Sequence, residues 1–303
     1  MKSFKRIVCL DKTNLSDWAL NKLADFSIEP VEYYSDYPKT EKEKLQRITD
    51  SDCVLLSWNT NLSSEIINKT KGLKYIGMCC SLYDKSSANV DIDAAEKNGI
   101  KVKGVKDYGD EGVVEFIFSE LIQLAKGLGS RQWKDSPTEL KGKVLGIIGF
   151  GTLGKMVASV AVAFGLKVLY YSRTRKKNLE TSNIRFSNLE NLLKEADIVT
   201  THLPRNNQIL GRKEFEAMKP NSILVNTSLG PTYNIDVLKE WIDKNENYLI
   251  VDLDGAEGYI DVYKNHPKII FFEGVVGMTD AAYDRLSQKV IQNIEEYLNS
   301  QIF

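Results

Sequence analysis

The sequence contains few of the residues that mark several classes of protein. It has only 4 Cys, 7 Pro and 2 His among 303 residues, and 40 Lys+Arg stand against 41 Asp+Glu for a net charge of -1. So little proline excludes collagen-like and low-complexity chains, and a balanced charge provides no bulk field for nucleic acid or an anionic membrane surface. We therefore expect neither nucleic acid nor a membrane as a partner.

The cysteines and the hydrophobic runs also exclude whole classes. Cys9, Cys53, Cys79 and Cys80 lie in apolar stretches and form neither a CxxC motif nor a Cys/His spacing typical of a metal site, so we expect reduced core thiols and no metal. The N-terminus lacks the apolar region of a secretory signal, and no stretch reaches the about 18 apolar residues of a membrane span. These absences predict a cytoplasmic protein.

The chain does contain a regular alternation of short apolar strands and amphipathic helices. In the first part, strands are predicted at residues 5–10, 30–34, 53–58 and 73–78, with helices between them. A long helix at 110–126 precedes a second run of strands at 143–148, 167–171, 196–200, 222–226, 248–252 and 269–272, and a final helix covers 280–298. This alternation predicts an α/β protein whose parallel sheets carry helices on both faces, the second being a complete doubly wound sheet.

A GxGxxG motif joins the first strand of the second run to a helix. It reads Gly149-Phe150-Gly151-Thr152-Leu153-Gly154. In this context the first glycine makes the tight turn, the second lets the backbone approach a pyrophosphate, and the third allows the helix to pack on the strand. The motif predicts a dinucleotide site, and a glycine-rich turn without a ligand is the alternative.

The end of the next strand indicates which dinucleotide binds. A site selective for NAD places an acidic residue there, but this chain reads Ser172-Arg173-Thr174-Arg175-Lys176-Lys177. Hydroxyl, guanidinium and ammonium groups suit a 2′-phosphate, so the sequence predicts NADP(H) rather than NAD(H). A solvated basic loop is the alternative.

Several motifs in order resemble those of the D-isomer-specific 2-hydroxyacid dehydrogenases. They lie at 113–115, 140–154, 196–204, 218–228 and 275–279. The resemblance implies a Rossmann doubly wound cofactor domain (106–279) inserted into a flavodoxin-like substrate domain (1–105 plus 280–303), with the active site in the cleft and a homodimer as the assembly. It also implies cofactor contacts beyond the glycine loop and the basic loop, from His202, Leu203, Pro204, Thr227, Ser228 and Asp252.

The catalytic residues of that family are changed here. The family anchors the substrate carboxylate with an Arg and moves the proton with a His that a Glu orients. The Arg position is Leu229 and the His position is Gly274. The Glu position falls on Glu257, although an alignment anchored on Asp254 places Tyr259 there. Leucine cannot bind a carboxylate and glycine cannot hold a proton, so simple 2-oxoacids are not the expected substrates.

Two functions follow from these residues. The first is an NADP(H)-dependent oxidoreductase of this family with an altered catalytic site, which reduces a small molecule such as an imine, an aldehyde or an activated alkene. Its protons come from Glu257, Tyr83, Tyr108, Glu273 or water. The alternative is a non-catalytic NADP(H)-binding sensor or scaffold protein. Hydride transfer survives the loss of the His only where the cleft orients the substrate correctly.

Overall fold

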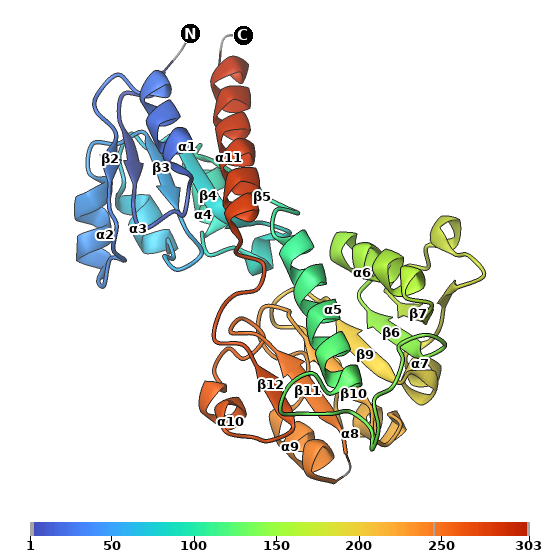
Figure 1. Ribbon diagram of the computed structural model, residues 1–303. Coiled ribbons are helices and arrows are strands. Elements are labelled where there is room, and N and C mark those ends of the chain that lie inside the picture. The colour runs from blue at the N-terminus through green and yellow to red at the C-terminus, as the bar shows by residue number, and fades with distance from the viewer. Residues whose placement is uncertain (1–2, 245, 302–303) are drawn as a thin grey trace. The chain divides into compact units, whose positions relative to one another are not determined.

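The chain folds into two compact units, each of which is described here by itself. The computed structural model describes residues 3–244 and 246–301 (Figure 1). One unit comprises Met1–Tyr108 and Thr279–Phe303, and the other comprises Gly109–Met278. Each contains a single parallel sheet with helices packed on it, which confirms the predicted α/β class.

The first unit has a five-stranded sheet in the order β2-β1-β3-β4-β5. All of its strand pairs are parallel. This is the order of flavodoxin-like folds. The strands are β1 (Ile7–Cys9), β2 (Glu32–Tyr33), β3 (Cys53–Leu56), β4 (Tyr75–Ser81) and β5 (Lys101–Val105).

Most helices of the first unit begin at side chains that cap them, the exception being the helix that starts at Asp17. Thr40 Oγ1 accepts from the Glu43 N–H at 3.1 Å, and Asp91 Oδ1 accepts from the Ala94 N–H at 2.9 Å. The helices are α1 (Asp17–Lys22), α2 (Glu41–Ile48), α3 (Ser64–Lys69), α4 (Ile92–Lys97) and α11 (Asp280–Ser300), with 3-10 turns at Leu23–Phe26 and Lys85–Ser87. The long α11 returns from the end of the chain to pack against β4 and β5.

The second unit has a seven-stranded parallel sheet in the order β12-β11-β10-β9-β6-β7-β8. Its first strand β6 lies between β7 and β9, so the strand order reverses there, as in a Rossmann fold. The strands are β6 (Val144–Ile148), β7 (Lys167–Tyr171), β8 (Ile184–Phe186), β9 (Ile198–Thr201), β10 (Ile223–Asn226), β11 (Tyr248–Val251) and β12 (Ile269–Phe271). The helices are α5 (Asp110–Lys126), α6 (Thr152–Ala163), α7 (Leu189–Glu195), α8 (Arg212–Ala217), α9 (Ile235–Lys244) and α10 (Ile260–Lys264).

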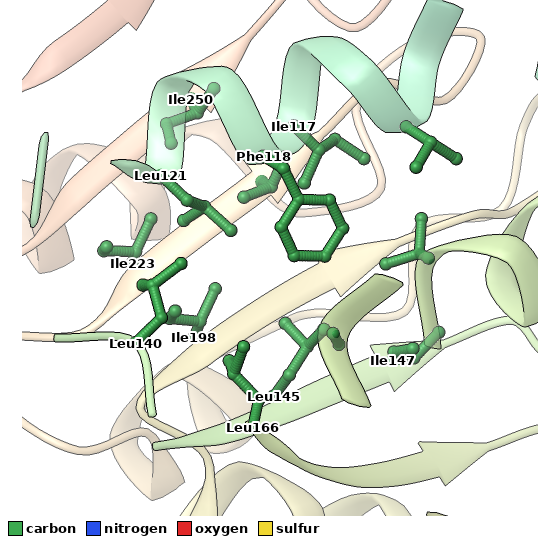
Figure 2. Close-up of a cluster of buried hydrophobic side chains, with 14 of the residues drawn as sticks. Ile117, Phe118, Leu121, Leu140, Leu145, Ile147, Leu166, Ile198, Ile223 and Ile250 are labelled. Atoms are coloured by element: carbon green, nitrogen blue, oxygen red, sulfur yellow. The ribbon is translucent and has the colours of Figure 1, made fainter. Parts of the chain in front are cut away.

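Helices cover both faces of this sheet. In Figure 2, Ile117, Phe118 and Leu121 of α5 point toward Leu145 and Ile147 of β6. The next residue of that strand, Ile148, packs in the opposite cluster, which contains apolar side chains from α7, α8 and α9. Successive β6 side chains therefore face opposite layers, as the two-residue period of a strand requires.

Two strands were not predicted from the sequence. β5 alternates lysine with valine and glycine, and β8 has three residues; each forms one edge of its sheet. Edge strands are often short and polar, so they lack the apolar run by which the buried strands were identified. The doubly wound sheet therefore has seven strands, and the prediction of six was wrong.

The predicted state of the cysteines is confirmed. Cys9, Cys53, Cys79 and Cys80 are free and buried, and burial raises the pKa of the Cys80 thiol to about 12.

Among residues 3–244 and 246–301, no group of three His, Cys, Asp or Glu side chains is placed to hold a metal ion. Within the same residues, no helix is both long enough and apolar enough to cross a membrane.

Candidate functional site

The glycine loop lies at the carboxyl end of β6, where the strand order reverses. Gly149 has φ +100°, and its N–H donates to the Tyr171 carbonyl of β7 at 2.9 Å. A Cβ on Gly149 would overlap the carbonyl oxygen of His202, which follows β9. Phe150 is buried and stacks on Tyr170, with ring centroids 4.0 Å apart, and so holds the loop against β7. Glycine is therefore required at position 149 both by its backbone conformation and by the close approach of the neighbouring strand.

The other two glycines of the loop differ in their surroundings. A Cβ on Gly154 would overlap the Gly149 carbonyl oxygen, so α6 packs too closely for any other residue. A Cβ on Gly151 would meet nothing within 4 Å, and this residue is exposed. The first turn of α6, beginning with Thr152 and Leu153, has no acidic residue and no side-chain cap. The N–H groups at such a helix start lack acceptors within the helix, and they favour an anion such as a phosphate.

The basic loop after β7 is held in place by a carboxylate that sequence reasoning missed. Arg175 donates from Nε and Nη2 to the two oxygens of Glu180, at 2.6 and 2.8 Å. The Tyr170 hydroxyl accepts from the Lys176 N–H at 2.8 Å, and Ser172 Oγ donates to the Thr174 carbonyl at 2.8 Å. The loop is therefore ordered, and one of its two guanidiniums is already paired.

Arg173 is the remaining guanidinium of this loop. It is exposed, and among the described residues it makes no hydrogen bond or ion pair. Arg173 can therefore bind a phosphate without breaking an existing contact. No sequence signal indicated that Arg175 and Arg173 differ in this way, because the pairing of Arg175 depends on where the chain folds back to Glu180.

The loops after β9 and β10 are joined by one hydroxyl. Ser228 Oγ donates to the Thr201 carbonyl at 3.0 Å and accepts from the Leu203 N–H at 3.1 Å. The Asn226 Oδ1 accepts from Thr201 Oγ1 at 3.0 Å and from the Ser228 N–H at 3.2 Å. These bonds fix the segment after β10 against residues 201–203, and the His202 carbonyl lies against Gly149 of the glycine loop.

Thr227, in the segment after β10, has a buried hydroxyl that lacks a hydrogen-bond partner among residues 3–244 and 246–301. An unpaired buried hydroxyl is costly, so it is typical of a place where a ligand or a water completes the hydrogen bonding.

Neither histidine can replace the missing one. The His202 Nε2 contacts Thr200 Oγ1 at 3.2 Å, and burial lowers the pKa of His202 to about 3, so its ring is neutral near pH 7. Its buried Nδ1 has no hydrogen-bond partner within the described part of the chain. His266 lies just before the amino end of β12, whereas position 274 follows the carboxyl end of that strand. Its Nε2 contacts Asp243 Oδ1 at 3.0 Å.

Position 274, where the family histidine is expected, lies under an aromatic ring. A Cβ on Gly274 would be 2.6 Å from Cε1 of Phe272, and the Phe272 ring also packs on Phe116 with centroids 5.7 Å apart. Gly274 has no positive φ, so its backbone can accept other residues. The neighbouring Glu273 is exposed and pairs with Lys264 at 3.1 Å. Position 274 is therefore restricted by a side chain and not by backbone strain.

The carboxylates after β11 have different partners. Asp252 is buried; its Oδ1 accepts from the Gly255 N–H at 2.9 Å and its Oδ2 from the Val276 N–H at 3.2 Å. Burial raises the pKa of Asp252 to about 6. Its Oδ2 thus joins β11 to the segment that follows β12, while its Oδ1 holds the turn directly after β11.

Glu257 lies over the loop that follows β10. Its Oε1 accepts from Arg205 Nη1 at 2.8 Å, and its Oε2 lies 3.4 Å from the position of a Cβ on Gly230. Gly230 directly follows Leu229, the position where the family arginine is expected, and Leu229 is half-buried. The structure therefore brings Glu257, Leu229 and Arg205 together at the carboxyl ends of neighbouring strands. Tyr259, the alternative for the family Glu, is half-buried two residues further on.

Two candidate tyrosines belong to the first unit. Tyr83 is exposed, and Lys106 Nζ lies 5.6 Å from the centre of its ring. The carbonyl of Tyr108 accepts from Arg285 Nε of α11 at 2.8 Å. A cation thus lies near the ring of Tyr83 and another at the backbone of Tyr108, and the proposed part of both residues in proton transfer stays a prediction.

The strand order and the glycine loop define the second unit as a dinucleotide-binding α/β domain. Comparison with known sequences agrees: residues 117–267 match the NAD-binding domain of the D-isomer-specific 2-hydroxyacid dehydrogenases. The chain belongs to this family of NAD(P)-dependent oxidoreductases, which act on small molecules.

Individual relatives extend the similarity over most of the chain. A glyoxylate reductase of Thermococcus litoralis is 28% identical over 294 residues, which cover 85% of this chain and 84% of the relative. An acyclic imino acid reductase, Bsp5, solved in complex with NADPH and D-arginine, has 26% identity and a TM-score of 0.81 over 97% of both chains. A family protein from Polaromonas sp. JS6 66 has a TM-score of 0.84 over 98% of this chain and 97% of its own, and its 24% identity shows the fold alone.

Proposed function

We propose that this protein is an NADP(H)-dependent reductase whose substrate is an imine, an aldehyde or an activated alkene and not a simple 2-oxoacid. One observation carries the proposal. The nucleotide loop is complete and open at Gly151, while the family resemblance assigns the Arg and His positions to Leu229 and Gly274. The proposal is therefore that nucleotide binding is kept and that the groups which bind and protonate an oxoacid are lost.

We propose that the cofactor binds to the loops at the carboxyl ends of the strands. The bound reduced nicotinamide supplies the hydride. The backbone of the glycine loop holds the pyrophosphate, and Arg173, with the hydroxyls of Ser172 and Thr174, faces the 2′-phosphate. The other proposed cofactor-binding residues are those that frame these loops: Gly149, Phe150, Gly151, Thr152, Leu153, Gly154, Arg175, His202, Leu203, Pro204, Thr227, Ser228 and Asp252.

The acid groups of the site favour a substrate that is basic or neutral over an anion. Leu229 and Phe272 provide apolar surface where the family binds a carboxylate, and Glu257 holds Arg205 instead of a histidine. The similarity to an imino acid reductase solved with NADPH supports an imine as the first substrate to test. Glu257, Tyr83, Tyr108, Glu273 and water remain the proton sources proposed from the sequence.

A non-catalytic NADP(H)-binding sensor or scaffold is the second candidate. It is favoured by the absence of both the Arg and the His from their family positions, because a protein that only binds the dinucleotide needs neither. Both the reductase and the sensor would bind NADP(H), so a binding measurement does not distinguish them. Only the reductase would oxidise NADPH with a substrate.

The test therefore has two stages. Calorimetry first measures whether NADPH binds and whether NADH binds more weakly. Oxidation of NADPH is then followed with a panel of imines, aldehydes and activated alkenes. Turnover of a panel member supports the reductase, while tight binding without any turnover supports the sensor.

The assembly and the location are also proposals. We propose a homodimer in the cytoplasm, from the family resemblance and from the sequence. Sedimentation of the purified chain tests the dimer, and fractionation of cells that produce it tests the location.

A further inference from the structure

The loop after β7 contains two arginines whose side chains differ in their partners. Ser172 Oγ donates to the Thr174 carbonyl at 2.8 Å, and the backbone bends between Arg173 and Arg175. Arg173 is exposed and makes no hydrogen bond or ion pair among the described residues. Arg175, in contrast, donates two hydrogen bonds to Glu180, at 2.6 and 2.8 Å. The two cations therefore come from one strand end, and only one of them is already paired.

Side chains from two strands hold Glu180 and Arg175 together. Glu180 lies between β7 and β8, and its side chain is only 17% exposed. The Tyr170 hydroxyl of β7 donates to Glu180 Oε1 at 3.2 Å. The Arg175 guanidinium carbon lies 5.7 Å from the centre of the Phe186 ring of β8. Both oxygens of the Glu180 carboxylate are thus bound, and Arg175 is held at two points.

We propose that Glu180 is a specificity-determining residue, which limits the preference for NADP(H) by holding Arg175 away from the 2′-phosphate. The inference rests on the proposed use of NADP(H). In Rossmann folds the adenosine ribose lies at the end of the second strand, here β7, where an arginine accommodates a 2′-phosphate. Arg173 supplies that arginine, while the second guanidinium of the loop is bound to Glu180.

The strength of the pair keeps Arg175 on Glu180 when a phosphate binds nearby. Ion pairs between freely exposed side chains contribute little, but two-point pairs of arginine with a partly buried carboxylate are stronger and fixed in direction. Release of Arg175 would also leave the Glu180 carboxylate without its cation beside an incoming dianion. Arg175 would therefore gain one anionic partner only by abandoning another.

The two dinucleotides distinguish this role from a purely structural one. NADPH and NADH differ only by the 2′-phosphate, so a residue that withholds a cation from that phosphate affects the binding of NADPH alone. A pair that only orders the loop would affect both dinucleotides, because both place their adenosine at the end of β7. Loss of the Glu180 charge therefore has opposite consequences under the two roles.

The test measures binding to four forms of the full chain by calorimetry at one ionic strength, without any turnover. Besides the wild type, Glu180→Gln removes the charge and keeps an oxygen that can accept from Tyr170. Glu180→Gln combined with Arg175→Gln removes both charges of the pair. Glu190→Gln is the matched control, because Glu190 forms an exposed pair with Lys194 on α7 at 2.7 Å. The ligands are NADPH, NADH and adenosine 2′,5′-bisphosphate.

We expect Glu180→Gln to bind NADPH and adenosine 2′,5′-bisphosphate about tenfold more tightly, the effect of one added charged hydrogen bond, with NADH affinity unchanged. The double variant should bind all three ligands as the wild type does, because a neutralised pair and a deleted pair both leave the phosphate to Arg173. Glu190→Gln should also bind as the wild type does.

Several results would overturn the inference, each for its own reason. Weaker binding of both dinucleotides by Glu180→Gln would show that the pair only orders the loop, and unchanged NADPH affinity would show that Glu180 limits nothing. An equal gain in the double variant or in Glu190→Gln would show that the removed charge acts without Arg175. NADPH binding by the double variant far below the wild type would show that Arg175 already reaches the phosphate.

These results leave the proposed reductase standing, because they concern only how the 2′-phosphate is held. A wild type that does not bind NADPH overturns the proposed function and this inference together. The wild-type titration therefore separates failure of the proposed cofactor from failure of the role of Glu180.

Discussion

The ring of Phe272 covers Gly274, with Cε1 2.6 Å from the position that a Cβ of residue 274 would take. Phe272 is 48% exposed, and its ring also packs against Phe116. An exposed ring can rotate away at modest cost, and the three atoms nearest to a Cβ on Gly274 all belong to this ring. This relationship decides how the family site can be restored.

Restoring the family side chains should increase oxoacid reduction, and a third change that makes room for them should increase it further. We expect Leu229→Arg with Gly274→His to increase reduction of glyoxylate and hydroxypyruvate, because the pair binds the carboxylate and supplies the proton. Adding Phe272→Thr, which replaces the ring by a small side chain, should increase it further by freeing the space for the imidazole. The gain from a general acid is about 10²–10⁴-fold, which steady-state kinetics resolves.

The control for this series is Phe272→Thr alone, which clears the space without adding the reactive groups and should stay inactive on oxoacids. Equal rates for the double and triple variants would show that the Phe272 ring is no obstacle. No gain in either would show that another part of the site prevents oxoacid reduction.

The choice of cofactor should depend on Arg173. We expect Arg173→Asp to weaken NADPH binding about tenfold or more and to reverse the preference toward NADH, because a carboxylate repels the 2′-phosphate and accepts from a free 2′-OH. Arg185→Asp makes the same charge change at an exposed position on β8 and should leave the preference for NADPH in place. Calorimetric titration of both cofactors checks this, and equal affinities in the wild type would contradict it.

The three glycines of the loop should respond differently to alanine. Gly149→Ala should lower the free energy of unfolding by more than the about 1–2 kcal/mol of a left-handed backbone, since its Cβ also overlaps the His202 carbonyl. Gly154→Ala should also destabilise the protein, because its Cβ would overlap the Gly149 carbonyl oxygen. Gly151→Ala should fold normally and yet bind NADPH more weakly. Thermal unfolding and calorimetry separate these effects, and normal NADPH affinity in Gly151→Ala would argue against the pyrophosphate position.

Asp254 should make stability depend on pH in a defined direction. Its pKa is raised from 3.8 to about 7 in the folded protein, so the folded state binds the proton more tightly than the unfolded state. Stability is then lost as the pH rises from about 4 to about 7, by about 1.4 kcal/mol for each pKa unit. Asp254→Asn should therefore be more stable than the wild type above about pH 7, with the difference shrinking toward about pH 4. Urea unfolding over this range checks the difference, and a constant difference would contradict it.

Most of the fold could be predicted because its signals are local in the sequence. The apolar runs located the buried strands, and the glycine spacing located the loop at the end of β6. The edge strands β5 and β8 were missed because polar and glycine residues conceal their period. A pattern that depends on burial cannot reveal strands that are only half-buried.

The candidate site could be predicted only in part, for a related reason. The loss of the family Arg and His at Leu229 and Gly274 is predicted from the sequence and stays a prediction. The pairing of Arg175 with Glu180 depends on how the chain returns after β7, and the place of Phe272 depends on a rotamer. The raised pKa of Asp254 arises from burial and from charges in two loops, those after β9 and after β11. None of these is encoded in a spacing, so the sequence did not reveal them.

The most direct test of the account is the rate of NADPH oxidation by the wild type, measured side by side with a simple imine and with glyoxylate, pyruvate and hydroxypyruvate. The account predicts turnover of the imine, or of another member of the aldehyde and alkene panel, and poor or no turnover of the three oxoacids. Brisk reduction of glyoxylate or pyruvate would contradict it, because another group would then have replaced the missing Arg and His.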